Sequence, residues 1–448
     1  MNKLGKSVKV IAINLAILAV LIEVVSITAY YFQNKAFFYA HSTRSIDPDL
    51  TIPESTQNQG NGQATIVQQL HPYFGFIDKV GIEHPLPYLQ SGHAANNYGF
   101  SSIYRYPFKR QNPNQFIVGI FGGSVAANYS FFEIDRHILA AALNQLPALA
   151  NKEIIVLPFA VGGYKQPQQL LVLSYFLSIG QDIDLAINID GFNEVSLAYM
   201  NYQHGLESSM PSDFILLPMV NLATGNLSKD ELELTLEILR EKENLANSVS
   251  SLASSRTATG YELSWLRSRY LIRSYRENLV KLDQLRIAKG PSGQSFMQLP
   301  AGPTISADEA LKQMAERWSA SSLLMKQLLD QRNIPYFQFI QPNQYAESRR
   351  VFSEKEKAIA FSETSAFKPG AVKGYPLLLE EFGKLRQAGL NAFNAIHVFD
   401  DVSEPVYSDN CCHYNEEGNT VFGKYVARTI TEALSKDARF NQSVAATK

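Results

Sequence analysis

Cysteine is almost absent from this chain of 448 residues. Its two cysteines, Cys411 and Cys412, are adjacent, so they cannot build the framework of several disulfides that staples small secreted proteins. Two cysteines also make no zinc site by themselves. An oxidising, exported compartment would permit a strained disulfide between these neighbours, and two free thiols are the alternative.

The chain also lacks an excess of charge of either sign. Its formal net charge is −2, and it has no run of lysines and arginines. Because nucleic acids are bound chiefly through basic surfaces, we expect no nucleic-acid partner. We find no low-complexity tract and no internal repeat, and the length suits one large domain or two ordinary ones.

The one long apolar segment lies at the N-terminus. Three lysines (Lys3, Lys6 and Lys9) precede an apolar stretch from Val10 to Phe32. Roughly 20 apolar residues suffice to cross a bilayer, and lysines favour the cytoplasmic side. We therefore expect residues 1–33 to be a cytoplasmic tip and a single-pass signal anchor in the cell membrane. The remainder would then be periplasmic or extracellular.

Two details of this segment leave alternatives open. A cleaved signal peptide is the alternative to an anchor, although Phe38-Tyr39-Ala40 is a poor cleavage site. Glu23 is an acid inside the apolar stretch, and we expect it to be protonated, to snorkel to the interface or to contact a partner helix.

Beyond the anchor, strands and helices alternate. Polar residues over 34–70 predict a linker, and the main domain is expected over 71–440, with a short β-rich segment at 71–115 and a C-terminal tail at 441–448. Apolar runs predict strands at 116–121, 153–161, 184–190, 334–341 and 396–400. Helices are expected at 130–146, 167–180, 306–331, 375–388 and after Gly418. This alternation predicts an α/β fold with a doubly wound, mostly parallel sheet, interrupted by a charged helical insertion at about 195–305.

Three consecutive predicted strands end in residues that acyl transfer can use. Ser124 follows Phe121-Gly122-Gly123, Gly163 follows the second strand, and Asn193 follows the third strand in Asp190-Gly191-Phe192-Asn193. His413 lies near the C-terminus, before the last predicted helix. The carboxyl ends of parallel strands meet at one edge of a sheet, where open α/β folds bind their ligands. A serine nucleophile needs a base, and the oxyanion it generates needs fixed N–H donors.

This order of motifs resembles the SGNH (GDSL-like) superfamily of esterases and acyltransferases, over residues 116–195 and 395–435. The resemblance implies a flavodoxin-like strand order, Ser124 as nucleophile, His413 as base and no metal or organic cofactor. It also implies an oxyanion hole made of the backbone N–H groups of Ser124 and Gly163 and the side-chain amide of Asn193.

The sequence departs from the superfamily pattern in three places. Gly123 stands where aspartate is common, and Glu194 stands where aspartate often follows the asparagine. More important, the acid expected three residues before the histidine is replaced by Asn410.

Several groups are candidates to orient His413. We favour Asp409, one residue further back, which would reach the histidine if the cysteines bend the loop as a disulfide would. Asp400 and Asp401, at the end of a predicted strand, are alternatives. A dyad of Ser124 and His413, oriented by Asn410 or a carbonyl, is another.

A polar segment after the fourth main strand is expected to line the substrate cleft. Asn343 and Tyr345, together with Tyr164, would offer amide and phenol groups to a hydroxylated substrate such as a glycan, and a structural turn at Pro342 is the alternative. The expected function is a membrane-anchored, exported serine esterase acting on carboxylic esters, with an acylated glycan or lipid as candidate substrate. The alternatives are an O-acyltransferase for a cell-surface polysaccharide and a non-catalytic glycan-binding or assembly module.

Overall fold

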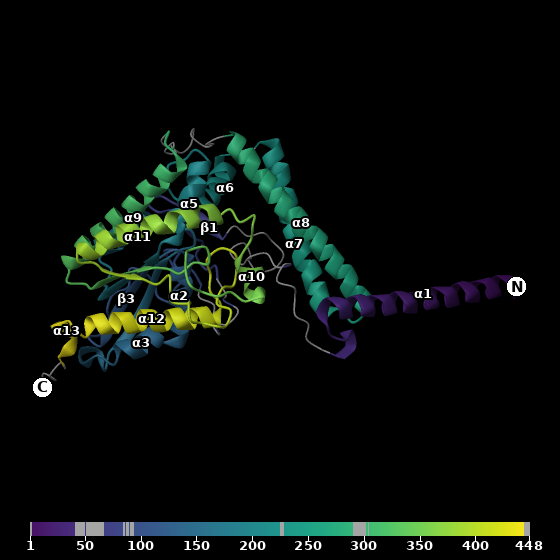
Figure 1. Ribbon diagram of the computed structural model, residues 1–448, viewed down its shortest axis with the longest axis horizontal. Coiled ribbons are helices and arrows are strands. Elements are labelled where there is room, and N and C mark those ends of the chain that lie inside the picture. Colours follow the sequence, from purple (N-terminus) through teal and green to yellow (C-terminus); the bar gives the residue numbers. More distant parts are fainter. Residues whose placement is uncertain are drawn as a thin grey trace. The chain divides into compact units, whose positions relative to one another are not determined.

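The computed structural model describes residues 2–40, 50, 67–83, 86, 89, 94–224, 228–289, 302 and 304–442 (Figure 1). Most of the linker expected over 34–70 and most of the tail expected over 441–448 lie outside the described residues. The chain divides into two compact units. One comprises residues 1–65 and 227–288, and the other comprises 66–226 and 289–448.

The larger unit is built on a five-stranded sheet in the order β4-β3-β5-β6-β7. All neighbouring strands are parallel. The strands are β3 (Gln115–Gly122), β4 (Glu153–Ala160), β5 (Leu185–Asp190), β6 (Tyr336–Ile340) and β7 (Asn391–Asn394). The first of these strands in the chain lies between the second and the third, which is the flavodoxin-like order. The doubly wound parallel sheet predicted from the sequence is therefore confirmed.

Helices cover both faces of this sheet, which leaves β3, β5 and β6 buried along their whole length. Figure 1 shows one layer below the sheet, formed by α2 (Ser124–Arg136), α3 (Ile138–Leu143) and α12 (Glu416–Leu434). The other layer contains α4 (Gln168–Ser178), α5 (Phe192–Gln203), α9 (Ala307–Asp330) and α11 (Lys368–Gln387). The short helices α6 (Asp213–Thr224), α10 (Glu354–Ala360) and α13 (Ala438–Asn441) complete the unit. An antiparallel hairpin of β1 (Gln68–His71) and β2 (Gly75–Asp78) precedes the sheet.

The turn from β3 into α2 requires glycine. Gly122 has φ +142°, and a Cβ there would lie 2.1 Å from the carbonyl oxygen of Ile189 on the neighbouring strand. The chain can therefore reverse directly from the strand into the helix, which begins at Ser124 rather than near residue 130 as predicted.

The last strand differs from its prediction. Residues 391–394 form β7, whereas the stretch predicted as a strand at 396–400 is a turn. The Asn394 side-chain oxygen accepts a hydrogen bond from the Ile396 N–H at 3.0 Å, which turns the chain away from the sheet. Ile396 and Phe399 are buried nonetheless, so their apolar character reflects packing of the turn and not strand pairing.

The smaller unit consists of α1 (Asn2–Asn34), a 3-10 turn (Phe38–Ala40) and the hairpin of α7 (Lys229–Ser254) and α8 (Ala258–Lys289). It has its own core, in which the rings of Tyr30, Phe38 and Tyr261 pack edge to face. Within α1, the segment Ile13–Asn34 is long and apolar enough to cross a membrane. Because α5 and α6 lie in the unit that contains the sheet, the separate helical part of the insertion is 227–288 and narrower than the predicted 195–305.

Glu23 of α1 contacts the start of α8. Its carboxylate accepts hydrogen bonds from the backbone N–H groups of Ala258 at 2.6 Å and Thr259 at 3.0 Å, and from the Tyr39 hydroxyl. The first N–H groups of a helix have no acceptor within the helix and carry the positive end of its dipole, so they stabilise a carboxylate. Of the surroundings considered for Glu23, contact with a partner helix is the one observed, and the partner belongs to the same chain.

Candidate active site

Ser124 lies at the topological switch point of the sheet. It is the first residue of α2 and directly follows the carboxyl end of β3, beside the strand β5 at which the winding reverses. No side chain caps this end of α2. The first N–H groups of a helix, including that of Ser124 itself, have no acceptor within the helix. The serine therefore lies at a helix N-terminus that favours negative charge.

The structure brings Ser124, His413 and Asp409 together in a hydrogen-bonded chain. His413 Nε2 lies 2.7 Å from Ser124 Oγ, and His413 Nδ1 lies 2.5 Å from Asp409 Oδ2. The side chains of His413 and Asp409 are 13% and 11% exposed, so the hydrogen bond between them is largely shielded from water. With Nδ1 protonated toward Asp409, Nε2 is free to accept the serine proton.

Asp409 reaches His413 because the backbone holds its carboxylate. Oδ1 accepts hydrogen bonds from the N–H groups of Cys411 at 2.9 Å, Cys412 at 3.0 Å and His413 at 3.2 Å. These bonds curl residues 409–413 into a tight turn and leave Oδ2 directed at the imidazole. A carboxylate four residues before the histidine thereby reaches the ring without a covalent bridge.

The other candidate acids lie elsewhere. Asp400 Oδ2 is 3.0 Å from His397 Nδ1 and 3.2 Å from Arg349 Nε, so this carboxylate orients a different histidine. Asp401 is exposed. Asn410 contributes its backbone carbonyl to another bond, accepting from the Tyr345 hydroxyl at 2.9 Å.

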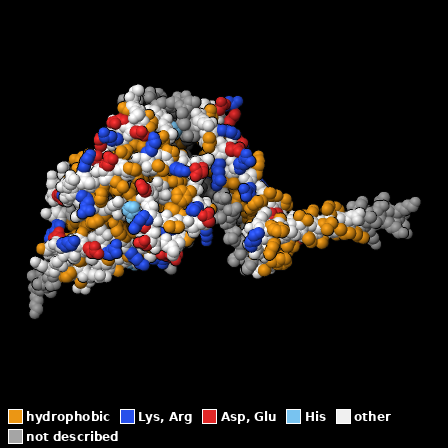
Figure 2. Space-filling view, viewed as in Figure 1, with side chains coloured by type: hydrophobic (Ala, Val, Ile, Leu, Met, Phe, Trp, Pro, Cys, Tyr) orange, Lys and Arg blue, Asp and Glu red, His pale blue; other side chains and the backbone are white. Residues whose placement is uncertain are grey.

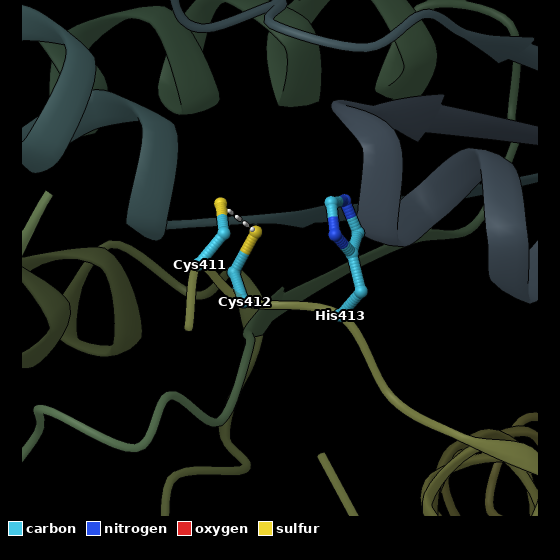
Figure 3. A group of neighbouring side chains, drawn as sticks. All are labelled: Cys411, Cys412 and His413. Carbon is cyan, nitrogen blue, oxygen red and sulfur yellow. Dashed lines mark hydrogen bonds between the residues drawn. The ribbon is translucent and has the colours of Figure 1, made fainter. Parts of the chain in front are cut away.

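The two cysteines beside the histidine are free thiols. Their sulfur atoms face each other 3.0 Å apart, and the His413 ring stands beside them (Figure 3). The geometry of Asp409 therefore does not depend on the disulfide that the sequence had suggested as its cause. Burial raises the pKa of the Cys412 thiol, but the bond from Cys411 and the charge of His413 lower it to about 7 overall.

These residues also have donor atoms that suit a thiophilic metal ion. The ligand atoms of Cys411, Cys412 and His413 lie within 4.8 Å of one another, and thiolate with imidazole is a donor set that zinc accepts. Both ring nitrogens of His413 are already hydrogen-bonded, to Ser124 and to Asp409. An ion using this histidine would have to displace one of those partners.

We expect a double variant, Cys411→Ser with Cys412→Ser, to keep ester hydrolysis within about threefold of the wild type, since the N–H groups that hold Asp409 are retained. The measurement is the initial rate on a short-chain ester, with and without a thiol reductant. A loss of more than about tenfold in the double variant, with an unchanged unfolding temperature, would show that the sulfur atoms act directly.

Charge and burial compete at the His413–Asp409 pair. Burial raises the pKa of Asp409, but the charge of His413 and the N–H bonds outweigh it and hold that pKa below its usual range. Burial lowers the pKa of His413, but the neighbouring Asp409 carboxylate and Cys412 raise it well above its usual range. The pair is therefore stabilised in its ionised form.

The segments that carry the residues predicted for the oxyanion hole lie beside Ser124 and Gly123. A Cβ at Gly162 would lie 3.9 Å from Ser124 Cβ, so the loop after β4, which contains Gly163, runs beside the serine. The Asn193 Nδ2 group donates to the Tyr164 carbonyl at 2.7 Å, which fixes its side chain at this loop. A Cβ at residue 123 would lie 2.1 Å from Asn193 Nδ2, which explains why glycine stands there in place of aspartate.

The predicted cleft residues use their polar groups inside the protein. Asn343 Nδ2 donates to the Cys411 carbonyl at 2.9 Å, and the Tyr345 hydroxyl donates to the Asn410 carbonyl at 2.9 Å. The Tyr164 hydroxyl donates to the Phe76 carbonyl at 2.6 Å. Asn343 and Tyr345 thus hold the turn that carries His413, as Gln344 does through the Asp409 carbonyl at 3.2 Å. A role in substrate contact stays a prediction.

A buried polar network that sequence reasoning missed supports the Asn193 loop. The Asp190 carboxylate accepts hydrogen bonds from Trp318 Nε1 at 2.9 Å and Gln338 Nε2 at 2.5 Å. The Glu194 carboxylate accepts from the N–H groups of Gly191 at 2.8 Å and Gln166 at 3.0 Å. Burial raises the pKa of both acids. The bonds of Glu194 join the loop after β4 to the start of α5, and those of Asp190 join the end of β5 to α9 and β6. The only signal in the sequence was the pair of acids flanking Asn193.

No family model matches this chain, and none of the curated protein sequences matches it. Among solved structures, it is similar to a protein of Bacteroides fragilis that is provisionally described as an acylhydrolase. The two share 10% sequence identity and a TM-score of 0.33, over 72% of this chain and 90% of that one. The fold and the site described above rest on the geometry of this chain itself.

Proposed function

We propose that this protein is an exported serine esterase of the SGNH type, held in the membrane by α1, that hydrolyses carboxylic esters through an acyl-Ser124 intermediate. The observation that carries the proposal is the continuous chain from Ser124 Oγ through His413 to the Asp409 carboxylate. The contact of the Asp409 carboxylate with His413 Nδ1 supports this proposal over a non-catalytic module, because the sequence has no acid at position 410.

Each of the three hydrogen-bonded residues has its own part in the proposed reaction. His413 Nε2 accepts the Ser124 proton as Oγ attacks the ester carbonyl carbon, and the Asp409 carboxylate stabilises the imidazolium that results. The tetrahedral intermediate collapses, the C–O bond to the alcohol breaks, and the alcohol leaves with the proton from His413. Water then loses a proton to His413 and attacks the acyl carbon, the bond from that carbon to Ser124 Oγ breaks, and His413 returns the proton to Oγ as the acid leaves.

The developing oxyanion would be stabilised by donors already in place. The N–H of Ser124 belongs to the unpaired N-terminus of α2. One hydrogen of the Asn193 amide binds the Tyr164 carbonyl, so the second is left for a substrate oxygen. Gly163 lies in the loop beside Ser124, with φ +83° that favours glycine.

The proposal is tested by assaying purified full-length protein in detergent with p-nitrophenyl esters of increasing acyl length. We expect hydrolysis above background, with a preference for one range of acyl lengths. A polysaccharide acceptor added in a parallel series distinguishes hydrolysis from transfer. Transfer to the glycan faster than to water would make the enzyme an O-acyltransferase with the same site. If folded protein showed neither hydrolysis nor transfer, the result would contradict the proposal.

Asn193→Ala should lower kcat by roughly 10²- to 10³-fold with little change in KM, because the lost donor acts mainly on the oxyanion of the transition state. The side chain is almost fully buried, so the thermal unfolding temperature must be measured alongside. Asn201→Ala is the matched control. It removes a buried amide from the same helix, α5, whose Nδ2 bonds the Met210 carbonyl at 2.9 Å. Equal losses of kcat in the two variants would argue against an oxyanion role.

The activity should depend on one deprotonation whose midpoint lies above the ordinary histidine pKa of about 6.5, because the reaction needs neutral His413 and its pKa is raised. The two groups of the ionised pair contribute to the free energy of unfolding in different ranges of pH. The contribution of His413 is fully present below about pH 6.5 and is lost as pH rises through its raised pKa. That of Asp409 is present above about pH 3.9 and is lost as pH falls through its lowered pKa. The measurement is kcat/KM against pH, and a midpoint below that of free histidine would contradict the account.

A further inference from the structure

The contact between Glu23 and the start of α8 fixes the position of the turn between α7 and α8, the tip of this hairpin, along the apolar helix α1. Glu23 lies eleven residues before Asn34, the end of the apolar segment Ile13–Asn34. At 1.5 Å per residue, this is about 16 Å of helix. The N–H groups of Ala258 and Thr259 bind the Glu23 carboxylate, so the start of α8 shares its depth. If α1 crosses the bilayer, the tip of the hairpin therefore lies at the outer surface of the membrane or below it.

The same end of α8 carries apolar side chains that the described residues of this unit leave exposed. Leu263 is 64% exposed, Leu266 57% and Tyr270 70%. Their spacing of three and four residues places them on one face of the helix. On α1, apolar residues before Glu23 are exposed as well, with Leu15 at 60% and Val20 at 63%. In Figure 2 the hydrophobic surface of α1 continues onto its junction with the hairpin.

The order of residues along α8 resembles the profile of a membrane interface. The exposed leucines come first, and exposed arginines follow on both sides of Tyr270: Arg267 and Arg269 before it, and Arg273 and Arg276 after it. Tyrosine is enriched at the level of the lipid headgroups, and arginine extends its charge into the aqueous side from an apolar stem. Arg256, at the very tip, is exposed too. A charge is costly in the hydrocarbon core, so the tip fits the headgroup boundary and not the bilayer centre.

We propose that the tip of the α7–α8 hairpin, residues 252–270, is a second membrane contact that docks into the outer interface of the bilayer. The proposal rests on α1 crossing that bilayer and is independent of the catalytic assignment. The occupant is lipid because the apolar face of α8 continues the lipid-facing surface of α1 and is joined to it through Glu23. Leu263, Leu266 and Tyr270 would lie at the boundary between acyl chains and headgroups, as in helices that lie in an interface.

Trp265, on the docking turn of α8, is a built-in probe, and the only other tryptophan is Trp318, which is fully buried in the larger unit. Full-length protein is reconstituted into vesicles whose lipids carry bromine either near the headgroups or deep in the acyl chains. Fluorescence quenching is compared with quenching by iodide in the buffer. The fluorescence of the variant Trp265→Phe comes from Trp318 alone, and it is subtracted from that of the wild type to give the signal of Trp265.

We expect bromine near the headgroups to quench Trp265 more strongly than deep bromine, and more strongly than iodide does. Quenching by iodide alone would place the tip in water, and quenching by no agent would mean that protein covers it. Stronger quenching by deep bromine would place it in the hydrocarbon core. If the protein did not float with the vesicles, the premise that α1 crosses the membrane would fail. Each of these outcomes overturns the proposal.

A pair of matched double variants tests the face itself. Leu263→Ser with Leu266→Ser should reduce the quenching by shallow bromine by at least about twofold, because interfacial binding scales with buried apolar area. The control is Leu232→Ser with Leu236→Ser, which changes two exposed leucines of α7 remote from the tip. All four side chains are exposed, so folding is retained. Equal quenching in the two variants would contradict the docking face. Ester hydrolysis in detergent, measured on the same preparations, tests the catalytic assignment separately.

Discussion

Replacing Ser124 by alanine is expected to lower kcat for ester hydrolysis by roughly 10⁴- to 10⁶-fold, because the reaction loses the nucleophile from which His413 Nε2 takes the proton. The residue begins α2 and its hydroxyl bonds only His413 among the described contacts, so the fold should be retained. The measurement is the initial rate on a short-chain ester, with the thermal unfolding temperature as the check on folding.

Ser130→Ala is the matched control for this substitution. Ser130 lies in the same helix and is fully buried, but its hydroxyl donates only to the Ala126 carbonyl at 2.7 Å. Its loss should leave kcat within about threefold of the wild type, since a helical back-bond contributes little. Activity that persists in Ser124→Ala would rule out the acyl-serine mechanism.

Asp409→Asn is expected to lower kcat by about 10⁴-fold while the turn around it survives. The asparagine oxygen can still accept the N–H groups of Cys411 and Cys412, as Asp409 Oδ1 does. Its NH₂ group would then face His413 Nδ1 and force that nitrogen to act as an acceptor. The ring proton moves to Nε2, and the histidine can no longer take the proton of Ser124.

The control for this prediction is Asp401→Asn, an exposed carboxylate that sequence reasoning had also considered. It should leave the rate unchanged, since it makes no contact with the site among the described residues. If Asp409→Asn kept its rate within about tenfold of the wild type, a backbone carbonyl would suffice to orient His413, and the site would operate as a dyad.

The central geometry could be predicted because it depends on strand ends. Alternating apolar runs located the strands along the chain, the resemblance to the SGNH superfamily implied their order in the sheet, and the carboxyl ends of parallel strands share one edge. Ser124, Gly163 and Asn193 follow three strands that are neighbours in the sheet. Periodicity and turn chemistry therefore placed these three residues at strand ends, and the resemblance supplied their roles.

The contacts of Asp409 could not be predicted in the same way. They depend on one turn in which a single carboxylate oxygen binds three successive N–H groups, and no periodic pattern marks such a turn. Likewise, Asn343 and Tyr345 looked like ligands for a substrate because they are polar and follow a strand. In the structure their polar groups bond the turn that carries His413.

The association of α1 with the hairpin was also out of reach of the sequence. The sequence predicted a charged helical insertion at about 195–305, but not which element the first turn of α8 would contact. Glu23 and Ala258 are separated by 235 residues, and only the folded chain shows that one binds the other. The unusual acid in an apolar segment was the signal, since a carboxylate in such a place needs donors.

The most direct test of the account is the covalent labelling of folded, full-length protein with a fluorophosphonate, followed by peptide mass spectrometry. A serine activated by a histidine attacks phosphorus and retains the phosphonyl group. We predict a single adduct on Ser124 in the wild type, no adduct in Ser124→Ala, and much slower labelling in Asp409→Asn. Labelling of a different residue, or no labelling of protein shown to be folded, would contradict the assignment of Ser124 as the nucleophile.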